Sequence, residues 1–216
     1  MKKSSMAAAA LSALGLVGIT VPAHAASFFT SETVFNTAAA PYGARTTESY
    51  ESAPGPASTS TSLDYAPITF SCTGSTYCPG FFGQSTFYAT DGTHSVFGAT
   101  PDSMTFTFSS AITAFATDLI GLGDVGATTF SALLSNGSSG VLFTDLSQGP
   151  GTVNFVGIVD AAGFTSVTFT GTRSGDGVFY DRTQYAMSAA VPEPETYALM
   201  LMGLGVMGYV ARRRKA

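Results

Sequence analysis

Apolar and polar residues alternate strictly in the middle of the chain. Residues 103–109 place Met104, Phe106 and Phe108 on one face and serines and threonines on the other, and residues 165–170 repeat the pattern. A period of two is the period of a half-buried β-strand, and threonine and phenylalanine both favour such a surface. Both segments are therefore predicted to be strands.

Further short segments of this kind, separated by Gly, Asn and Asp, extend over most of the chain. They predict strands at 46–51, 66–72, 86–90, 112–119, 128–135, 140–146, 152–159, 178–180 and 183–188. Asn136-Gly137 predicts a two-residue hairpin between two of them, and Ser31 is expected to cap a short helix over 31–40. Short strands at this spacing predict an all-β fold, an antiparallel β-sandwich.

The N-terminal end has the pattern of a secretory signal peptide over residues 1–25. Lys2 and Lys3 precede an apolar, small-residue segment over 6–20. A small-x-small cleavage site, with Ala23 and Ala25 as its small residues, then comes directly before Ala26. This order is typical of a cleaved export signal. The middle of the chain, 26–190, is therefore predicted to be a single exported domain, here called the passenger domain.

The C-terminal end, 191–216, has three parts. Pro192, Glu193 and Pro194 hold the chain extended, and an uncharged apolar run follows over 196–211. As a helix this run would be roughly 24 Å long, enough to cross a bilayer core of about 30 Å if flanking arginine stems extend to the interface. A single transmembrane helix is predicted there; a buried core helix is the alternative. The stop-transfer cations are Arg212, Arg213, Arg214 and Lys215, expected on the cytoplasmic side.

The passenger domain is acidic. Its only basic side chains besides histidine are Arg45, Arg173 and Arg182, and it contains no lysine. Such a surface repels phosphate backbones, so no nucleic-acid partner is expected. It is compatible with divalent cations or a neutral polysaccharide, while solubility alone would also account for it.

Cys72 and Cys78 are the only cysteines, and five residues separate them along a short loop. In an exported domain an even cysteine count favours a disulfide bond between them. No third or fourth soft ligand stands nearby in the sequence, so a metal site at these cysteines is not indicated.

Candidates for chemistry are few, and no enzyme activity is predicted. His94 is the only histidine of the passenger domain, without a nucleophile motif beside it, although a carboxylate pair for glycoside hydrolysis stays open. The best cluster is Asp176, between two glycines, and Asp181. With Glu51 they would offer oxygen ligands to calcium if the first and last strands pair. A hairpin turn with exposed acids is the alternative.

The three-part C-terminal end resembles the PEP-CTERM sorting signal of Gram-negative bacteria. The resemblance implies recognition of Pro192, Glu193 and Pro194 by an exosortase, a membrane processing enzyme that cuts near this motif. It further implies transient anchoring of 196–211 in the inner membrane, with release to the cell surface or extracellular space.

The passenger domain also resembles the domain that commonly accompanies such tails. The resemblance rests on F-G-A-T-P-D-S-M-T-F-T-F-S, G-F-T-S-V-T-F-T-G and G-D-G-V-F-Y-D-R, and it implies a jelly-roll-like sandwich. The expected function is that of a non-catalytic structural, adhesive or polysaccharide-associated component of exopolysaccharide or biofilm. A secreted carbohydrate-active enzyme is one alternative. An ice-binding surface protein is another, and it would require a flat threonine-rich face.

Overall fold

The computed structural model describes residues 25–53, 62–73, 80–82, 86–188, 200–204 and 207. The signal peptide up to residue 24, the sorting motif at 192–194 and the cations at 212–215 lie outside the described residues. Residues 200–204 are helical, within the predicted helix 196–211. Among the described residues, no helix combines the length and the apolar character that crossing a membrane requires. The transmembrane helix stays a prediction.

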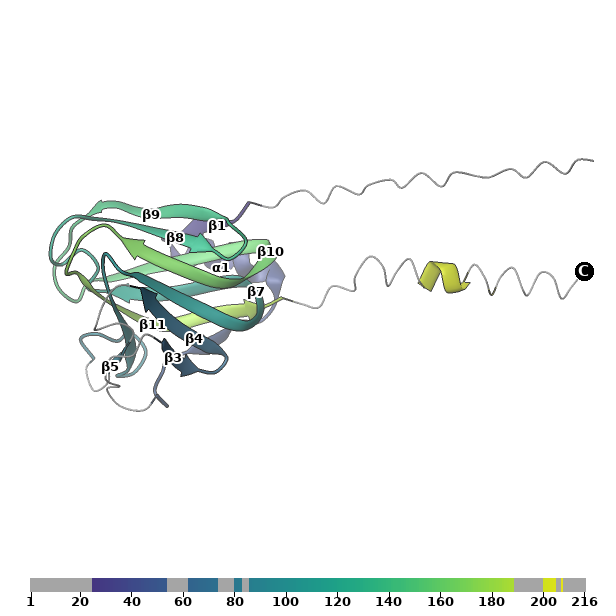
Figure 1. Ribbon diagram of the computed structural model, residues 1–216, viewed down its shortest axis with the longest axis horizontal. Helices are drawn as coiled ribbons and strands as arrows, with labels where there is room; N and C mark the ends of the chain where they lie inside the picture. The colour runs from purple at the N-terminus through teal and green to yellow at the C-terminus, as the bar shows by residue number, and fades with distance from the viewer. Residues whose placement is uncertain are drawn as a thin grey trace, which may run out of the picture.

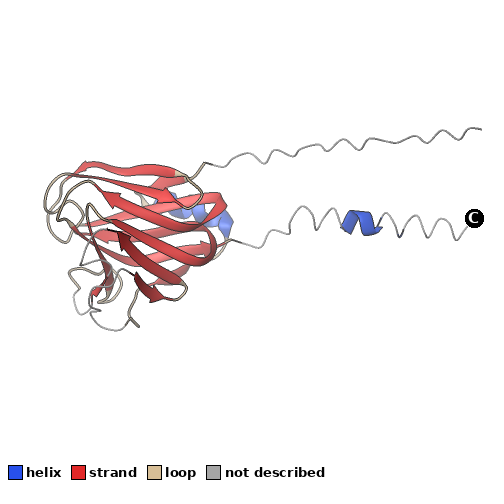
Figure 2. Cartoon of the chain, viewed as in Figure 1, coloured by secondary structure: helices blue, strands red, loops and turns tan. Residues whose placement is uncertain are grey.

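The described part of residues 25–188 forms an antiparallel β-fold with one short α-helix (Figure 1, Figure 2). The helices are α1 (Glu32–Ala39) and the 3₁₀ helix η1 (Ala40–Tyr42). The strands are β1 (Ser27–Phe29), β2 (Thr46–Glu48), β3 (Ser62–Tyr65), β4 (Ile68–Thr73), β5 (Gly80–Phe82), β6 (Ser95–Ala99), β7 (Ser103–Ile120), β8 (Thr128–Leu134), β9 (Ser139–Leu146), β10 (Val153–Gly171) and β11 (Gly177–Met187).

The two longest strands, β7 and β10, run through both layers of the sandwich. They pair with each other along both halves, with register shifts between Val159 and Ser166. The first layer has the order β3-β4-β7-β10-β8-β9 and uses the β7 and β10 halves at 103–108 and 166–171. The second layer has the order β5-β6-β11-β7-β10-β1 and uses the other halves, with β2 also paired to β11. One continuous sheet thus folds over on itself into the predicted β-sandwich.

An aromatic core fills the space between the layers. Phe106 is fully buried, and its ring centroid lies 5.0 Å from that of Phe70, 5.3 Å from Phe115 and 5.2 Å from Tyr180. Most of these pairs are edge-to-face, the arrangement that the ring quadrupole favours. The apolar side chains of 103–109 therefore face inward, as the alternation predicts, and their hydroxyl-bearing neighbours face outward.

Helix α1 covers part of the outer face of the second layer and lies behind the first layer in Figure 1. Phe35 packs there against small residues of the sheet, among them Ala114, Ala116 and Gly157. A Cβ on Gly157 would stand 2.5 Å from Phe35 Cδ2, so only glycine allows this approach. Ser31 occupies the N-cap position as predicted, but its side chain makes no capping hydrogen bond.

Several strand predictions need correction. Residues 103–109 and 112–119 belong to one bent strand, as do 152–159 with 165–170, because the backbone continues across the layers without a turn. Residues 178–180 and 183–188 also belong to one strand, β11, which stays in the second layer and has a bulge between Asp181 and Gln184. The strand predicted at 86–90 is wrong, since these residues form turns and bends. A hairpin at Asn136-Gly137 is confirmed, since it joins the paired strands β8 and β9 and Gly137 has a φ of 89°, but its connection spans residues 135–138 rather than two residues.

Candidate functional site

Rows of hydroxyl groups cross the outer face of the first layer. The strand register places Ser71, Thr105 and Thr168 in one row, and residues directly opposite one another share a face of the sheet. The same register gives a second row from Thr73 to Ser131 and a third from Thr69 to Ser166. We call this surface the hydroxyl face; it comprises Thr69, Ser71, Thr73, Ser103, Thr105, Thr107, Ser131, Ser166, Thr168 and Thr170.

Hydrogen bonds within the rows orient these hydroxyl groups. Thr105 Oγ1 lies 2.9 Å from Thr168 Oγ1, and Ser103 Oγ lies 3.1 Å from Thr170 Oγ1. A hydroxyl group has one donor and two acceptor sites, so each such pair retains acceptor capacity toward solvent. Four hydroxyl groups of the face are thus held in pairs, and Thr69 Oγ1, at the β4 edge, donates to Asp64 Oδ1 at 2.9 Å.

A hollow of about 660 Å³ lies at the β8–β9 end of the hydroxyl face. Leu133 and Val141 present apolar surface there and are 51% and 61% exposed. Its lining combines hydroxyl, backbone and apolar groups: Ser131, Ala132, Leu133, Ser139, Gly140, Val141, Thr168 and Thr170. Hydroxyl groups beside C–H surface complement a sugar ring, which itself carries both. The outward position of Leu133 follows from the alternation around the buried Leu134, but sequence reasoning did not identify it as a site residue.

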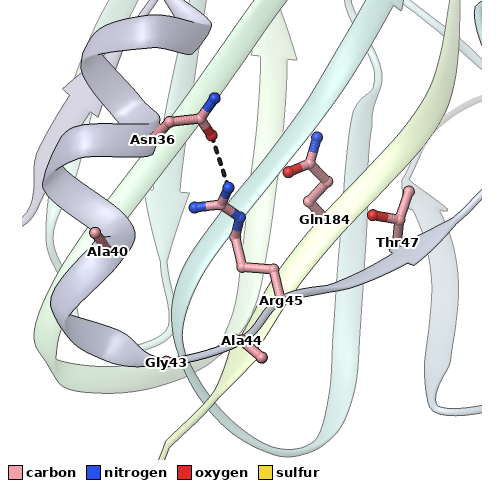
Figure 3. A pocket seen from close by; sticks show the side chains of 7 residues that line it. All are labelled: Asn36, Ala40, Gly43, Ala44, Arg45, Thr47 and Gln184. Carbon is pink, nitrogen blue, oxygen red and sulfur yellow. Dashed lines mark hydrogen bonds between the residues drawn. The ribbon is translucent and has the colours of Figure 1, made fainter.

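A second hollow, of about 330 Å³, lies between α1, β2 and β11 (Figure 3). Arg45 points across it toward α1, and its Nη2 donates to Asn36 Oδ1 at 2.7 Å. The guanidinium carbon also lies 5.2 Å from the centroid of the Phe35 ring. Thr47 and Gln184 line the opposite side. The guanidinium group of Arg45 is thus already engaged by the Asn36 amide and the Phe35 ring.

Beside this hollow, Arg182 joins two carboxylates. Its Nη1 lies 2.6 Å from Glu32 Oε1, and its Nε lies 2.8 Å from Asp118 Oδ2. A bulge of β11 with a φ of 47° at Arg182 aims the side chain between them. Hydrogen bonding from Arg182 lowers the pKa of Glu32, and Asp118, followed by Glu32, raises the pKa of Arg182 above its usual value. The cluster ties α1 to the sheet.

The structure does not gather the three predicted calcium ligands into one cluster. Although β2 and β11 do pair, Glu51 and Asp181 are both occupied by the loop at 90–94. Asp181 Oδ2 accepts hydrogen bonds from the amides of Thr90 and Asp91, at 2.6 and 2.7 Å. Asp176 instead accepts from the amide of Gly123 at 2.8 Å. Across the described ranges, no group of three or more His, Cys, Asp or Glu side chains is placed to hold a metal ion.

Glu51 fastens this loop rather than forming a site with Asp176. Its Oε1 accepts from the backbone amides of Thr93 and His94, at 2.6 and 2.7 Å. These bonds, led by that of Thr93, lower the pKa of Glu51 to about 2. His94 Nδ1 lies 3.3 Å from Glu51 Oε2, so the only histidine of the passenger domain serves the same local anchor. Burial, followed by the Asp124 carboxyl group, raises the pKa of Asp176 to about 6.

The remaining predicted sites lie largely outside the described residues. The described chain contains no free cysteine, but Cys78 is not among the described residues, so its bond to Cys72 stays a prediction. Ala23 and the sorting residues are likewise outside. Ala26, the predicted first residue after cleavage, packs against the core.

Comparisons with known proteins bear on the C-terminal end and on the fold. Residues 190–215 match the PEP-CTERM protein-sorting motif, so the chain carries this motif. A comparison with curated protein sequences gives no significant match.

Solved structures similar to this chain include three of low sequence identity. One is the K2 cleaved adhesin domain of Lys-gingipain, with 15% identity, a TM-score of 0.44, and coverage of 67% of this chain and 100% of that one. Another is TmCBM61 in complex with β-1,4-galactotriose, with 13% identity, a TM-score of 0.36, and coverage of 58% and 91%. The third is the C-terminal family 22 carbohydrate-binding module of Clostridium thermocellum Xyn10B, with 9% identity, a TM-score of 0.39, and coverage of 68% and 95%. Scores this low do not transfer any binding property to this chain.

Proposed function

We propose that this protein, which carries a PEP-CTERM sorting motif and is therefore exported and sorted to the cell surface, binds a neutral polysaccharide on its hydroxyl face without catalysing a reaction. We further propose that the producing cell is a Gram-negative bacterium. An exosortase there cuts near Pro192–Pro194 after transient anchoring of the chain in the inner membrane. The protein then becomes a structural or adhesive component of exopolysaccharide or biofilm.

The single observation that carries this proposal is the set of hydroxyl rows aligned across β4, β7 and β10. Strands in a sheet lie about 4.8 Å apart, so the rows form a regular array of donors and acceptors. A polysaccharide presents repeated hydroxyl groups of the same two-way kind. The lining of the adjoining hollow adds apolar surface from Leu133 and Val141 and includes no acidic or basic side chain.

The carbohydrate-active enzyme remains the alternative that turnover would establish. Such an enzyme needs two carboxyl groups flanking an accessible bond. Asp118 and Asp181 stand opposite each other in register, but both are buried, and Thr90 and Arg182 hydrogen-bond to Asp118. This arrangement favours a structural role for the pair, so the proposal assigns binding rather than hydrolysis.

Ice binding is a second candidate, because the threonine rows of the hydroxyl face meet its requirement for a threonine-rich surface. Thermal hysteresis of the purified protein would support it. A freezing point equal to the melting point, together with glycan retention, would assign the face to polysaccharide alone.

The test is retention of the full-length protein on neutral exopolysaccharide, compared with the variants Thr168→Val and Thr47→Val. Each removes one hydroxyl and preserves shape and strand preference, but Thr168 lies in the hydroxyl face whereas Thr47 lines the second hollow. A lost neutral hydrogen bond of about 0.5–1.5 kcal/mol corresponds to a roughly 2- to 10-fold weaker Kd for Thr168→Val. Equal retention of Thr168→Val and the unchanged protein, or a loss confined to Thr47→Val, would contradict the proposal.

A further inference from the structure

A buried carboxylate oxygen has no partner where the loop after β7 meets the turn before β11. Asp176 is fully buried, and its Oδ2 accepts from Gly123 N at 2.8 Å. Its Oδ1 is buried without a hydrogen-bond partner. An unsatisfied buried oxygen of this kind is costly and rare in folded proteins, and a bound water or ion is among the partners that satisfy such an oxygen.

A second carboxylate and a backbone carbonyl converge on the same place. The Asp124 carboxyl group lies close enough to that of Asp176 to raise its pKa, after burial the largest cause that does so. Gly177 O and Asp124 Oδ2 lie 3.0 and 3.6 Å from the position that a Cβ on Gly121 would take. Gly177 O and Asp124 Oδ2 therefore border the small space that Gly121 leaves open, and the Asp176 carboxyl group interacts with that of Asp124.

The loop that carries Asp124 is held in place by its own contacts. Asp124 N donates to Gly121 O at 3.1 Å, and Gln148 N donates to Gly123 O at 3.0 Å. Arg173 Nη2 donates to Val125 O at 3.2 Å, so this cation binds the loop through its backbone. The carboxylates of Asp124 and Asp176 are thus kept close although like charges repel.

We propose that Asp124, Asp176 and the carbonyl group of Gly177 form a calcium-binding site. Carboxylate and carbonyl oxygens are the hard ligands that Ca²⁺ takes, in a flexible shell that water completes. A divalent cation would satisfy the unpartnered Oδ1 and remove the repulsion between the two carboxylates. Asp176 is the one residue shared with the calcium site expected from the sequence; Asp124 and Gly177 replace Glu51 and Asp181.

Two protein carboxylates make a weak site, of the class with a Kd of about 10⁻⁴–10⁻³ M found in extracellular modules. Such an affinity suits an exported domain, since it allows occupation outside the cell.

The test is calcium binding by the full-length protein, measured by isothermal titration calorimetry with CaCl₂, with MgCl₂ at equal ionic strength for comparison. We expect one Ca²⁺ per chain, and at least 10-fold weaker binding by Asp124→Asn. This variant changes a half-buried side chain and keeps its size, so folding should persist, which circular dichroism would verify. Asp102→Asn, an acid in another turn, is the matched control and should bind as the unchanged protein does.

Thermal unfolding gives an independent readout. Calcium at 10 mM, compared with EDTA, should raise the Tm by about 3–10 °C if it exceeds the Kd 10- to 100-fold. Asp124→Asn should lose this shift, whereas Asp102→Asn should keep it. No saturable binding up to 10 mM, or binding unaffected by Asp124→Asn, would overturn the assignment and leave a shared proton as the link between the carboxyl groups. Glycan retention measured on the same samples tests binding by the hydroxyl face independently of the calcium site.

Discussion

Replacing Arg182 should destabilise the protein out of proportion to its position near the surface. The Arg182 side chain is 27% exposed, but that of its partner Asp118 is only 4% exposed. Arg182→Met keeps much of the aliphatic stem and removes the charge, which leaves a buried aspartate without its cation. Breaking a fully buried pair in this way costs about 3–5 kcal/mol, so we expect about 2–3 kcal/mol for this partly exposed one. The corresponding loss in Tm is roughly 4–12 °C for a domain of this size.

The ion pair between Arg182 and Glu32 should contribute less to the free energy of unfolding. Glu32 is 39% exposed, and exposed ion pairs contribute at most about 1 kcal/mol. Glu32→Gln should therefore cost well under half as much as Arg182→Met. Adding Asp118→Asn to Arg182→Met should recover about 1 kcal/mol or more, because it removes the stranded charge.

The measurement is urea unfolding followed by circular dichroism, with the free energy of unfolding extrapolated to water for each variant. Arg45→Met is the matched control, since Arg45 pairs with the neutral Asn36 rather than with a buried carboxylate. The reasoning would be refuted if Arg182→Met and Arg45→Met cost the same, or if Asp118→Asn further destabilised the Arg182→Met protein.

Two further outcomes follow from the geometry. The folded-state pKa of Glu51 is lowered from 4.5 to about 2, so its contribution is complete above about pH 5 and is lost as the pH falls toward 2. The Tm difference between the unchanged protein and Glu51→Gln should disappear over this range. At higher pH the two proteins should differ by less than about 1 kcal/mol in the free energy of unfolding, because the Glu51 side chain is 41% exposed. Gly157→Ala should cost about 1–3 kcal/mol in urea unfolding, since its Cβ would stand 2.5 Å from Phe35, whereas Gly149→Ala meets nothing within 4 Å and should be near neutral.

The sequence predicts the sandwich well where one face is buried. Met104, Phe106 and Phe108 alternate with hydroxyl-bearing residues, and this period fixes both the strand and its inward face. It does not predict that β7 continues to Ile120. The small polar residues at the bend have the composition of a turn, and only pairing with β10 on both sides of the bend keeps the backbone extended.

The candidate sites were predictable to different degrees. The outward threonines of 103–109 and 165–170 follow from alternation, but their alignment into rows depends on the pairing of β4, β7 and β10, which the sequence does not specify. The calcium expectation included Asp176, which the structure buries with one carboxylate oxygen unpartnered. It could not place Asp124 beside it, because the two lie more than fifty residues apart and meet only through the folded loops.

The two outer faces of the sandwich differ in how far the protein's own residues cover them. On the second layer, α1 covers the sheet through Phe35, and the Arg182 cluster fastens the helix by its first turn. The loop at 90–94 is anchored there by Glu51 and Asp181, so the charged groups of that layer are engaged within the protein. β1 and β11, the first and last strands, also belong to this layer. In the proposed function, anchoring through the segment after β11 would therefore act on the covered layer and leave the hydroxyl face, on the other layer, for an external polymer.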